Sequence, residues 1–159
     1  MIHPLTYIHP YAKLAPNVKI DPFTVIHKNV EIGEGTWIGS NVTIMEGARI
    51  GKNCRIFPGA VLSAIPQDLK FAGEDTTIEI GNNTTIREFV TIHRGTKDRS
   101  KTKIGNNCLI MAYCHIAHDC FVGDYCILSN STTLAGHITV GDYAVLAGMT
   151  EVNQFCQIG

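Results

Sequence analysis

One period organises this chain: a branched aliphatic residue stands at every sixth position. The series begins at Ile2 and ends at Ile158, and only Asp68, Glu74 and Asp98 interrupt it. An α-helix repeats its apolar face about every 3.6 residues and a half-buried strand about every two, so neither element produces a period of six. The chain is therefore predicted to repeat one small structural unit along almost its whole length.

A six-residue repeat with one large aliphatic side chain is typical of a parallel β-helix. Each hexad forms a short strand and a turn, and three hexads close one coil of about 18 residues. The position four residues after the aliphatic is small, as at Thr24, Ala48 and Ala60, because a narrow interior has no room for two large side chains per hexad. Glycine follows the aliphatic in many hexads, where we expect a corner to need permissive backbone. The predicted fold is all-β.

Composition narrows the class of protein. The 159 residues carry a formal net charge of −1, which gives no electrostatic case for binding nucleic acid. The first ten residues lack the basic start and apolar run of a signal peptide, and no apolar stretch is long enough to span a bilayer. We expect a cytoplasmic protein with a single domain over residues 1–159, no nucleic-acid partner and no membrane span.

The cysteines all fall at the small inward position of the hexad. A zinc site needs convergent ligands at closely defined spacing, and a disulfide framework suits short secreted chains without a core. We therefore predict that these thiols pack as compact core side chains. They are Cys54, Cys108, Cys114, Cys120, Cys126 and Cys156.

Two segments leave the repeat, at about residues 63–79 and 93–103. Functional residues collect on such excursions because a regular coil expels what it cannot pack. The second segment has a single acid, Asp98, and is otherwise a local basic patch, which indicates either a solvated loop or a docking site for an anionic partner or phosphate. Its basic residues are Arg94, Lys97, Arg99, Lys101 and Lys103.

Histidine placement supplies the next clue. The period is unbroken from residue 104 onward, so residues 18 apart should stack in columns, which places His118 beneath Gly136 and Gly136 beneath Gln154. Asp119 follows His118 directly and could orient its ring or stabilise the imidazolium. The residues that flank the column are His137 and Asn153.

Such a column could support acyl transfer to a hydroxyl group. A neutral histidine near pH 7 can remove the proton from an attacking alcohol as a general base. A backbone N–H at a glycine one coil away could receive the developing oxyanion. No serine or cysteine nucleophile is needed if the acyl donor is an activated thioester that the alcohol attacks directly.

Five segments of the chain resemble a known family. The chain is similar to the acyl-carrier-protein:UDP-N-acetylglucosamine O-acyltransferases that begin lipid A synthesis. The resemblance implies a left-handed parallel β-helix, an exception to the usual right-handed crossover, and a homotrimer with active sites between neighbouring subunits. It also implies transfer of a 3-hydroxyacyl chain from acyl carrier protein to the 3-hydroxyl of UDP-N-acetylglucosamine. The segments are QDLKFAGE (67–74), TIREFVTIHRGT (85–96), MAYCHIAHDC (111–120), TLAGH (133–137) and NQFC (153–156).

The resemblance also implies roles for individual residues. His118 matches the family's general base, Asp119 its partner, and Gly136 the amide that receives the oxyanion. No cofactor or metal is implied, because the acyl donor is carried on the phosphopantetheine of acyl carrier protein. The implied substrate-binding residues are Gln67, Asp68, Lys70, His93, His115, His137, Asn153 and Gln154.

Two departures from the family pattern stand out. The family motif usually has Ala and His where this chain has Glu151 and Asn153, and asparagine can hydrogen-bond but cannot carry positive charge. Family members also continue with further coils and a C-terminal helical domain, which is absent here. We therefore expect a shortened form of the enzyme.

The residues leave three other functions open. The chain could be a non-catalytic trimeric β-helix that serves as a scaffold. It could be the related N-acyltransferase of the same pathway. It could also be a zinc enzyme of the γ-carbonic-anhydrase type, with His93, His115 and His118 as ligands.

Overall fold

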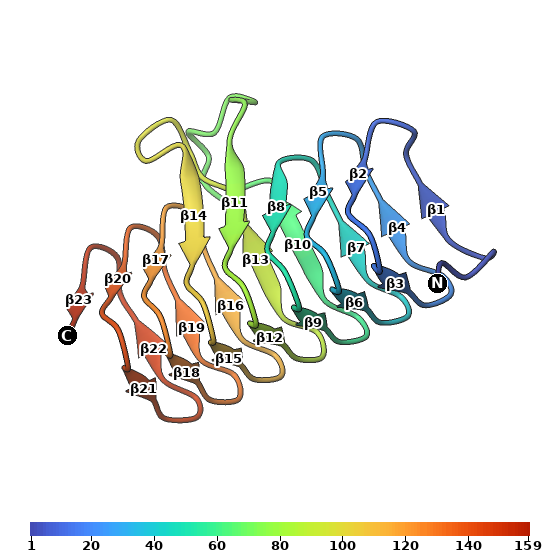
Figure 1. Ribbon diagram of the computed structural model, residues 1–159. Coiled ribbons are helices and arrows are strands. Elements are labelled where there is room, and N and C mark those ends of the chain that lie inside the picture. Colours follow the sequence, from blue (N-terminus) through green and yellow to red (C-terminus); the bar gives the residue numbers. More distant parts are fainter.

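The computed structural model describes residues 1–159 and consists of short parallel strands joined by turns. The strands form three sheets of eight, eight and seven strands, and each sheet takes every third strand of the chain. Figure 1 shows the sheets as three faces of one long coil, with the termini at its two ends. The structure contains no helix of the length and apolar character needed to cross a lipid bilayer.

The first sheet consists of β1 (Tyr7–Ile8), β4 (Val25–Ile26), β7 (Thr43–Ile44), β10 (Val61–Ala64), β13 (Thr91–His93), β16 (His115–Ile116), β19 (Thr133–Leu134) and β22 (Glu151–Val152). The second consists of β2 (Lys13–Leu14), β5 (Glu31–Ile32), β8 (Ala48–Ile50), β11 (Thr77–Ile80), β14 (Lys101–Ile104), β17 (Phe121–Val122), β20 (Thr139–Val140) and β23 (Gln157–Ile158). The third consists of β3 (Lys19–Ile20), β6 (Trp37–Ile38), β9 (Arg55–Ile56), β12 (Thr85–Ile86), β15 (Leu109–Ile110), β18 (Ile127–Leu128) and β21 (Val145–Leu146).

The six-residue period produces vertical columns of aliphatic side chains inside the coil. In the first sheet, for example, Ile92 pairs with Ile116 and Ile116 with Leu134. These columns and the small inward residues form one core of 32 buried side chains. Each buried Ile or Leu contributes roughly 1.5 to 3 kcal/mol relative to exposure. The predicted parallel β-helix is confirmed.

The glycines that follow the aliphatic are needed for a different reason from the one we expected. Gly81 and Gly105 do not have a left-handed φ, so backbone permissiveness does not explain them. Instead the coils stack at backbone contact: a Cβ built on Gly81 would lie 2.6 Å from the carbonyl carbon of Gly105. The left-handed corners fall elsewhere in the hexad, for example at Asp119 (φ 60°) and His137 (φ 63°).

Two excursions interrupt the coil, and they are shorter than the sequence predicted. The loops cover residues 65–76 and 94–100, because β10, β11, β13 and β14 extend into the predicted segments. The extra residues pair with each other, Ala64 with His93 and Thr77 with Lys101. In Figure 1 the two loops project from the same corner of the coil. Pairing between the extended strands therefore brings both loops to one place.

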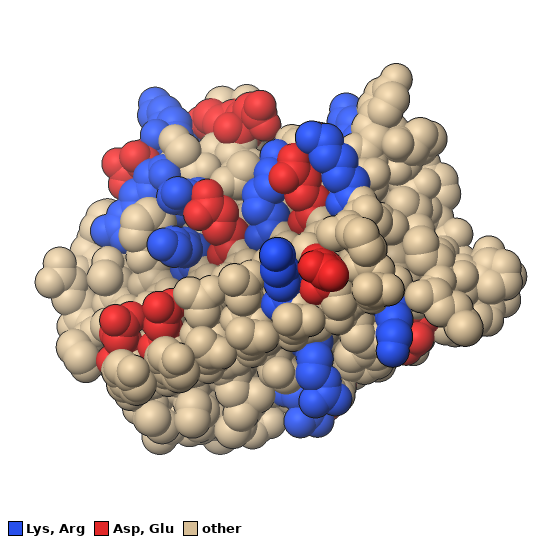
Figure 2. Space-filling model, viewed as in Figure 1, with Lys and Arg blue, Asp and Glu red and all other residues tan.

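The predicted basic patch of the second excursion is largely partnered. Lys101 forms an ion pair with Glu79 at 3.1 Å, and the Arg99 guanidinium lies over the ring of Phe121. Figure 2 shows acidic and basic side chains interleaved on this side of the molecule. The segment is therefore neither a bare cationic surface nor a loop held only by solvent.

Five of the six cysteines are buried, and Cys156 is exposed. The buried thiols donate to backbone carbonyl oxygens, as Cys120 does to Ala135 at 3.0 Å. Burial raises the pKa of Cys108 and of Cys120 to about 11, so these thiols stay protonated and inert. The packing prediction is confirmed for five cysteines and wrong for Cys156, which is exposed.

We predict that Ile110→Ala lowers the free energy of unfolding by about 2 to 5 kcal/mol, because Ile110 is fully buried and the change leaves a cavity. Val145→Ala is the matched control, since Val145 is 67% exposed and should change stability by less than about 0.5 kcal/mol. Denaturant unfolding at one protein concentration measures both. Equal effects of the two changes would contradict the inward assignment of the aliphatic column.

Candidate active site

One cavity gathers most of the residues predicted to be functional. Its volume is about 650 Å³, and it lies where the first excursion meets the corners that follow β16, β19 and β22. The predicted residues that line it are Gln67, Asp68, Lys70, His93, His115, His118, Gly136, His137 and Gln154. Lining residues that sequence reasoning missed are Leu69, Ala117, Thr133, Ala135 and Phe155. They are sequence neighbours of the predicted set, which is the one signal that could have found them.

Two predicted residues do not line the cavity. Asp119 is fully buried behind His118, where it contacts the imidazole rather than the open space. Asn153 is exposed and lies outside the cavity, although the next two residues of the same corner, Gln154 and Phe155, line it. The structure therefore does not place Asn153 among the groups that could meet a ligand there.

A second groove, of about 690 Å³, lies over the sheet that contains β2, β5 and β8. It contains no histidine, and some of its charged residues are paired, as Lys13 is with Glu31 at 3.3 Å. Glycine corners such as Gly33 and Gly51 form part of its wall. The groove has no imidazole held by a buried carboxylate, so the chemistry is sought in the histidine-lined cavity.

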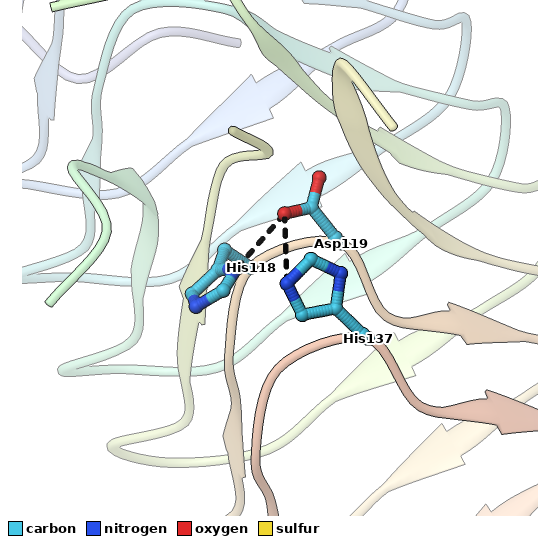
Figure 3. A group of neighbouring side chains, drawn as sticks. All are labelled: His118, Asp119 and His137. Carbon is cyan, nitrogen blue, oxygen red and sulfur yellow. Dashed lines mark hydrogen bonds and ion pairs between the residues drawn. The ribbon is translucent and has the colours of Figure 1, made fainter. Parts of the chain in front are cut away.

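Behind the cavity wall, the buried Asp119 carboxylate lies beside the imidazoles of His118 and His137 (Figure 3). The Nδ1 atom of His118 lies 2.8 Å from Oδ2 of Asp119, within hydrogen-bond distance. The Nε2 atom of His137 lies 3.9 Å from the same oxygen. Because Asp119 accepts a hydrogen bond from Nδ1–H, the neutral form of His118 presents an unprotonated Nε2 to the cavity.

Hydrogen bonds keep the Asp119 carboxyl ionised despite its burial. Burial alone would raise the pKa of Asp119, but donors from Thr96, His118 and Arg99 outweigh burial and lower the pKa below its usual value. A buried carboxylate with these donors is a fixed negative charge. It stabilises any positive charge that forms on His118.

The stacked column predicted from the period is present. The amide of His137 donates to the carbonyl of His118 at 3.1 Å, and the amide of Phe155 donates to the carbonyl of Gly136 at 3.3 Å. A Cβ built on Gly136 would lie 2.5 Å from Cε1 of His118. Glycine is therefore required at this position because the His118 ring occupies the space of a side chain.

A second pair of histidines forms the other side of the cavity. The rings of His93 and His115 meet edge to face at 4.7 Å, and Nδ1 of His115 lies 2.7 Å from Oγ1 of Thr91. Burial, followed by the charges of His115 and His118, lowers the pKa of His93 to about 4. Burial also lowers the pKa of His115. Both rings are therefore neutral near pH 7.

The first excursion carries Asp68 to the column. Its Oδ2 atom lies 4.0 Å from Nε2 of His118, and its Oδ1 atom accepts the amide N–H of Lys70 at 2.9 Å. Leu69 between them is fully exposed at the cavity mouth. The polar residue that interrupts the aliphatic period at position 68 is therefore a residue of the cavity.

Asp98, another interruption of the period, also reaches this region. Its Oδ2 atom lies 3.0 Å from Nδ1 of His137, and the His137 ring stacks on Phe155 at 4.6 Å. Sequence reasoning noted Asp98 as a break without assigning it a role. Only the folding of the second excursion against the column reveals the contact.

One group could be considered for a metal ion: ligand atoms of His118, Asp119 and His137 lie within 4.8 Å of one another. Each Asp119 oxygen already accepts two hydrogen bonds, from Thr96, Arg99 and His118. A carboxylate has about four acceptor positions, so all are occupied. The arrangement is an oriented imidazole rather than a metal cage. His93, His115 and His118, the alternative zinc ligands, do not form such a convergent group.

Comparisons with known proteins show the family of the chain. The chain matches the bacterial transferase hexapeptide (six repeats) model over residues 29–64 and 101–136. The structure of a UDP-N-acetylglucosamine acyltransferase from Bacteroides fragilis covers 100% of this chain and 67% of its own, with 44% identity and a TM-score of 0.84. The chain belongs to the UDP-N-acetylglucosamine acyltransferase family. Its coil is accordingly a left-handed parallel β-helix, as the resemblance implied.

Other family members extend the comparison. The chain is 52% identical over 160 aligned residues to the acyl-[acyl-carrier-protein]–UDP-N-acetylglucosamine O-acyltransferase of Xylella fastidiosa, which it matches along its whole length. The structure of LpxA from Acinetobacter baumannii superposes with a TM-score of 0.97 at 44% identity, over 98% of this chain. The chain spans 61% of the length of each of these two proteins.

We predict that Gly136→Ala displaces the His118 imidazole, because the new methyl group would overlap its ring. Gly148→Ala is the matched control, since its Cβ would approach only Asn130, at 3.5 Å. Imidazole NMR signals of histidine-labelled protein measure the displacement. A His118 signal that is the same in both variants would contradict the contact.

We predict that the protein loses stability as the pH falls from about 6.5 to about 4 because of His93. Its pKa is lowered on folding, from 6.5 to about 4, so the unfolded chain binds the proton more tightly across that window. The loss from this group is on the order of 3 kcal/mol. His93→Gln should make denaturant unfolding less dependent on pH over that range; an unchanged dependence would show that His93 titrates alike in both states.

Proposed function

We propose that the chain catalyses transfer of a 3-hydroxyacyl group from acyl carrier protein to the 3-hydroxyl of UDP-N-acetylglucosamine, the first step of lipid A synthesis. One observation carries the proposal: His118 points Nε2 into the cavity while its Nδ1 proton is held by the buried Asp119. The activity after which the relatives are named supplies the substrates. No part of the chemistry requires a metal or a redox group.

The proposed reaction proceeds by direct attack on a thioester. Nε2 of His118 removes the proton of the sugar hydroxyl while the hydroxyl oxygen bonds to the thioester carbonyl carbon. Asp119 stabilises the imidazolium that results. When the tetrahedral intermediate collapses, the carbon–sulfur bond breaks and the phosphopantetheine thiol leaves with the proton from His118. The products are the O-acylated sugar nucleotide and free carrier thiol.

Gly136 is proposed to stabilise the oxyanion of the intermediate. Its amide N–H makes no hydrogen bond within the chain, so it is free to donate to a developing negative charge. The position of its Cα against the His118 ring places this donor close to the general base. A side chain at this position would disturb both groups.

The remaining cavity residues are proposed to hold the substrates. Gln67, Asp68 and Lys70 are suited to the sugar and the start of the acyl chain, because the first excursion presents them at the mouth of the cavity. The neutral rings of His93 and His115 can donate or accept hydrogen bonds without placing a positive charge beside His118. Gln154 lies in the same cavity and is suited to the nucleotide. Asn153 is not assigned a contact.

The proposed assembly is a homotrimer with the site between neighbouring subunits, and the proposed protein partner is acyl carrier protein. An open cavity on the outer face of the coil, rather than inside it, fits a site that a neighbouring subunit completes. The acyl donor arrives on the carrier's phosphopantetheine, so the chain needs no cofactor of its own. The cytoplasmic location stays a prediction from the sequence.

We predict that the purified chain converts 3-hydroxyacyl carrier protein and UDP-N-acetylglucosamine to the acylated sugar nucleotide, and that His118→Ala abolishes this. Loss of a general base typically costs about 10² to 10⁴-fold in rate. Mass spectrometry of the sugar nucleotide and release of the carrier thiol measure the reaction. His27→Ala is the control, since His27 lies outside the cavity.

The outcomes separate the alternatives. A product that forms equally well with His118→Ala would remove the proposed base. Acylation only of an amino-sugar acceptor would indicate the N-acyltransferase instead. A folded protein that binds neither substrate by calorimetry would favour a scaffold.

A further inference from the structure

The carboxylate of Asp119 is oriented mainly by the second excursion and not by the coil that carries it. Its Oδ1 atom accepts the amide N–H groups of Thr96 at 3.0 Å and Arg99 at 3.2 Å. Its Oδ2 atom accepts the Thr96 hydroxyl together with Nδ1 of His118. Three of the four donors therefore come from residues 94–100.

The coil itself fixes only the backbone of Asp119. Its amide N–H donates to Oγ1 of Thr102 at 2.9 Å, and its left-handed φ is the ordinary corner conformation of this fold. Two other left-handed corner residues, Tyr125 and Tyr143, are exposed. Without the loop, the only side chains of the coil beside the Asp119 carboxylate would be the imidazoles of His118 and His137.

The loop is built to place Thr96 over this carboxylate. Gly95 precedes it at a point where a Cβ would overlap the amide nitrogen of Lys101, so the two ends of the loop close tightly. The amide of Ser100 donates to the Thr96 carbonyl at 2.8 Å. The Arg99 side chain anchors the turn by donating to the Asp119 carbonyl and to Thr139. Thr96 is itself buried.

We propose that Thr96 is a positioning residue for the His118 base, acting through Asp119. Its hydroxyl donates to Oδ2 of Asp119 and so fixes the direction from which that oxygen accepts Nδ1–H of His118. This hydrogen bond in turn fixes the orientation and the tautomer of the imidazole. The proposal rests on the proposed acyl transfer for its kinetic consequences, whereas the structural part concerns the hydrogen bond alone. The second excursion is then part of the catalytic apparatus and not only a surface loop.

The kinetic test compares Thr96→Val with Thr96→Ser. Valine keeps the shape and removes the hydroxyl, and we expect kcat to fall about 10- to 100-fold with little change in KM, as for other groups that orient a functional imidazole. Serine keeps the hydroxyl and should retain most of the activity. Thr84→Val is the matched control, because Thr84 is a buried threonine whose hydroxyl donates to Gly105, in the coil wall away from the cavity.

A double variant distinguishes positioning from general damage. If Thr96 acts through Asp119, adding Thr96→Val to Asp119→Ala should lower kcat by less than about twofold further, because the two residues then act as one unit. Independent losses that multiply would overturn the proposal. So would equal loss of kcat in Thr96→Val and Thr84→Val, or no loss in Thr96→Val. If the valine variant does not fold, Thr96→Ala takes its place in every comparison.

A spectroscopic readout decides the structural part without any reaction. In histidine-labelled protein, the Nδ1–H proton of His118 should give a low-field resonance that is identified by its loss in His118→Gln. We expect it to shift or broaden in Thr96→Val and to persist in Thr96→Ser and Thr84→Val. An unchanged resonance in Thr96→Val would overturn the proposal. A wild-type chain with this resonance but no acyl transfer would contradict the proposed function alone.

Discussion

The whole molecule depends on coils stacked at backbone contact distance. Inside the coil, the stacking produces the aliphatic columns, such as Ile92, Ile116 and Leu134. At the corners it leaves no room for a Cβ at Gly81. On the outside the same stacking brings Gly136 against the His118 ring. One vertical repeat therefore stabilises the core and also builds the column of the candidate active site.

The chemistry becomes possible where that regularity is interrupted. A corner side chain of the coil is normally exposed to water, where a carboxylate interacts only weakly with a neighbouring imidazole. The second excursion covers the Asp119 corner and replaces water with fixed donors from Thr96 and Arg99. The first excursion brings Asp68 to the opposite side of His118. Strand pairing between the two excursions is what makes them meet at the same site.

Electrostatics in the cavity follow from unequal burial and pairing. Asp119 is buried, but its four hydrogen-bond donors outweigh the burial and lower its pKa, so the carboxyl group stays charged. His93 is buried with an Nδ1 atom that has no hydrogen-bond partner, and its pKa is lowered to about 4. The cavity thus combines one fixed negative charge behind His118 with neutral imidazoles opposite. The carboxylate therefore stabilises the positive charge that His118 acquires when it accepts a proton.

The sequence by itself determined the fold and much of the site, because the period of six is a direct consequence of stacking. It predicted the core, the column of His118, Gly136 and Gln154, and both excursions, although the ends of the loops and the reason for the glycines differed. It could not show that Asn153 lies outside the cavity, nor that Thr96 and Asp98 reach the histidine corner. The contacts of Thr96 and Asp98 depend on how an irregular loop folds against a regular coil, and only the tertiary structure decides contacts between segments that share no repeat.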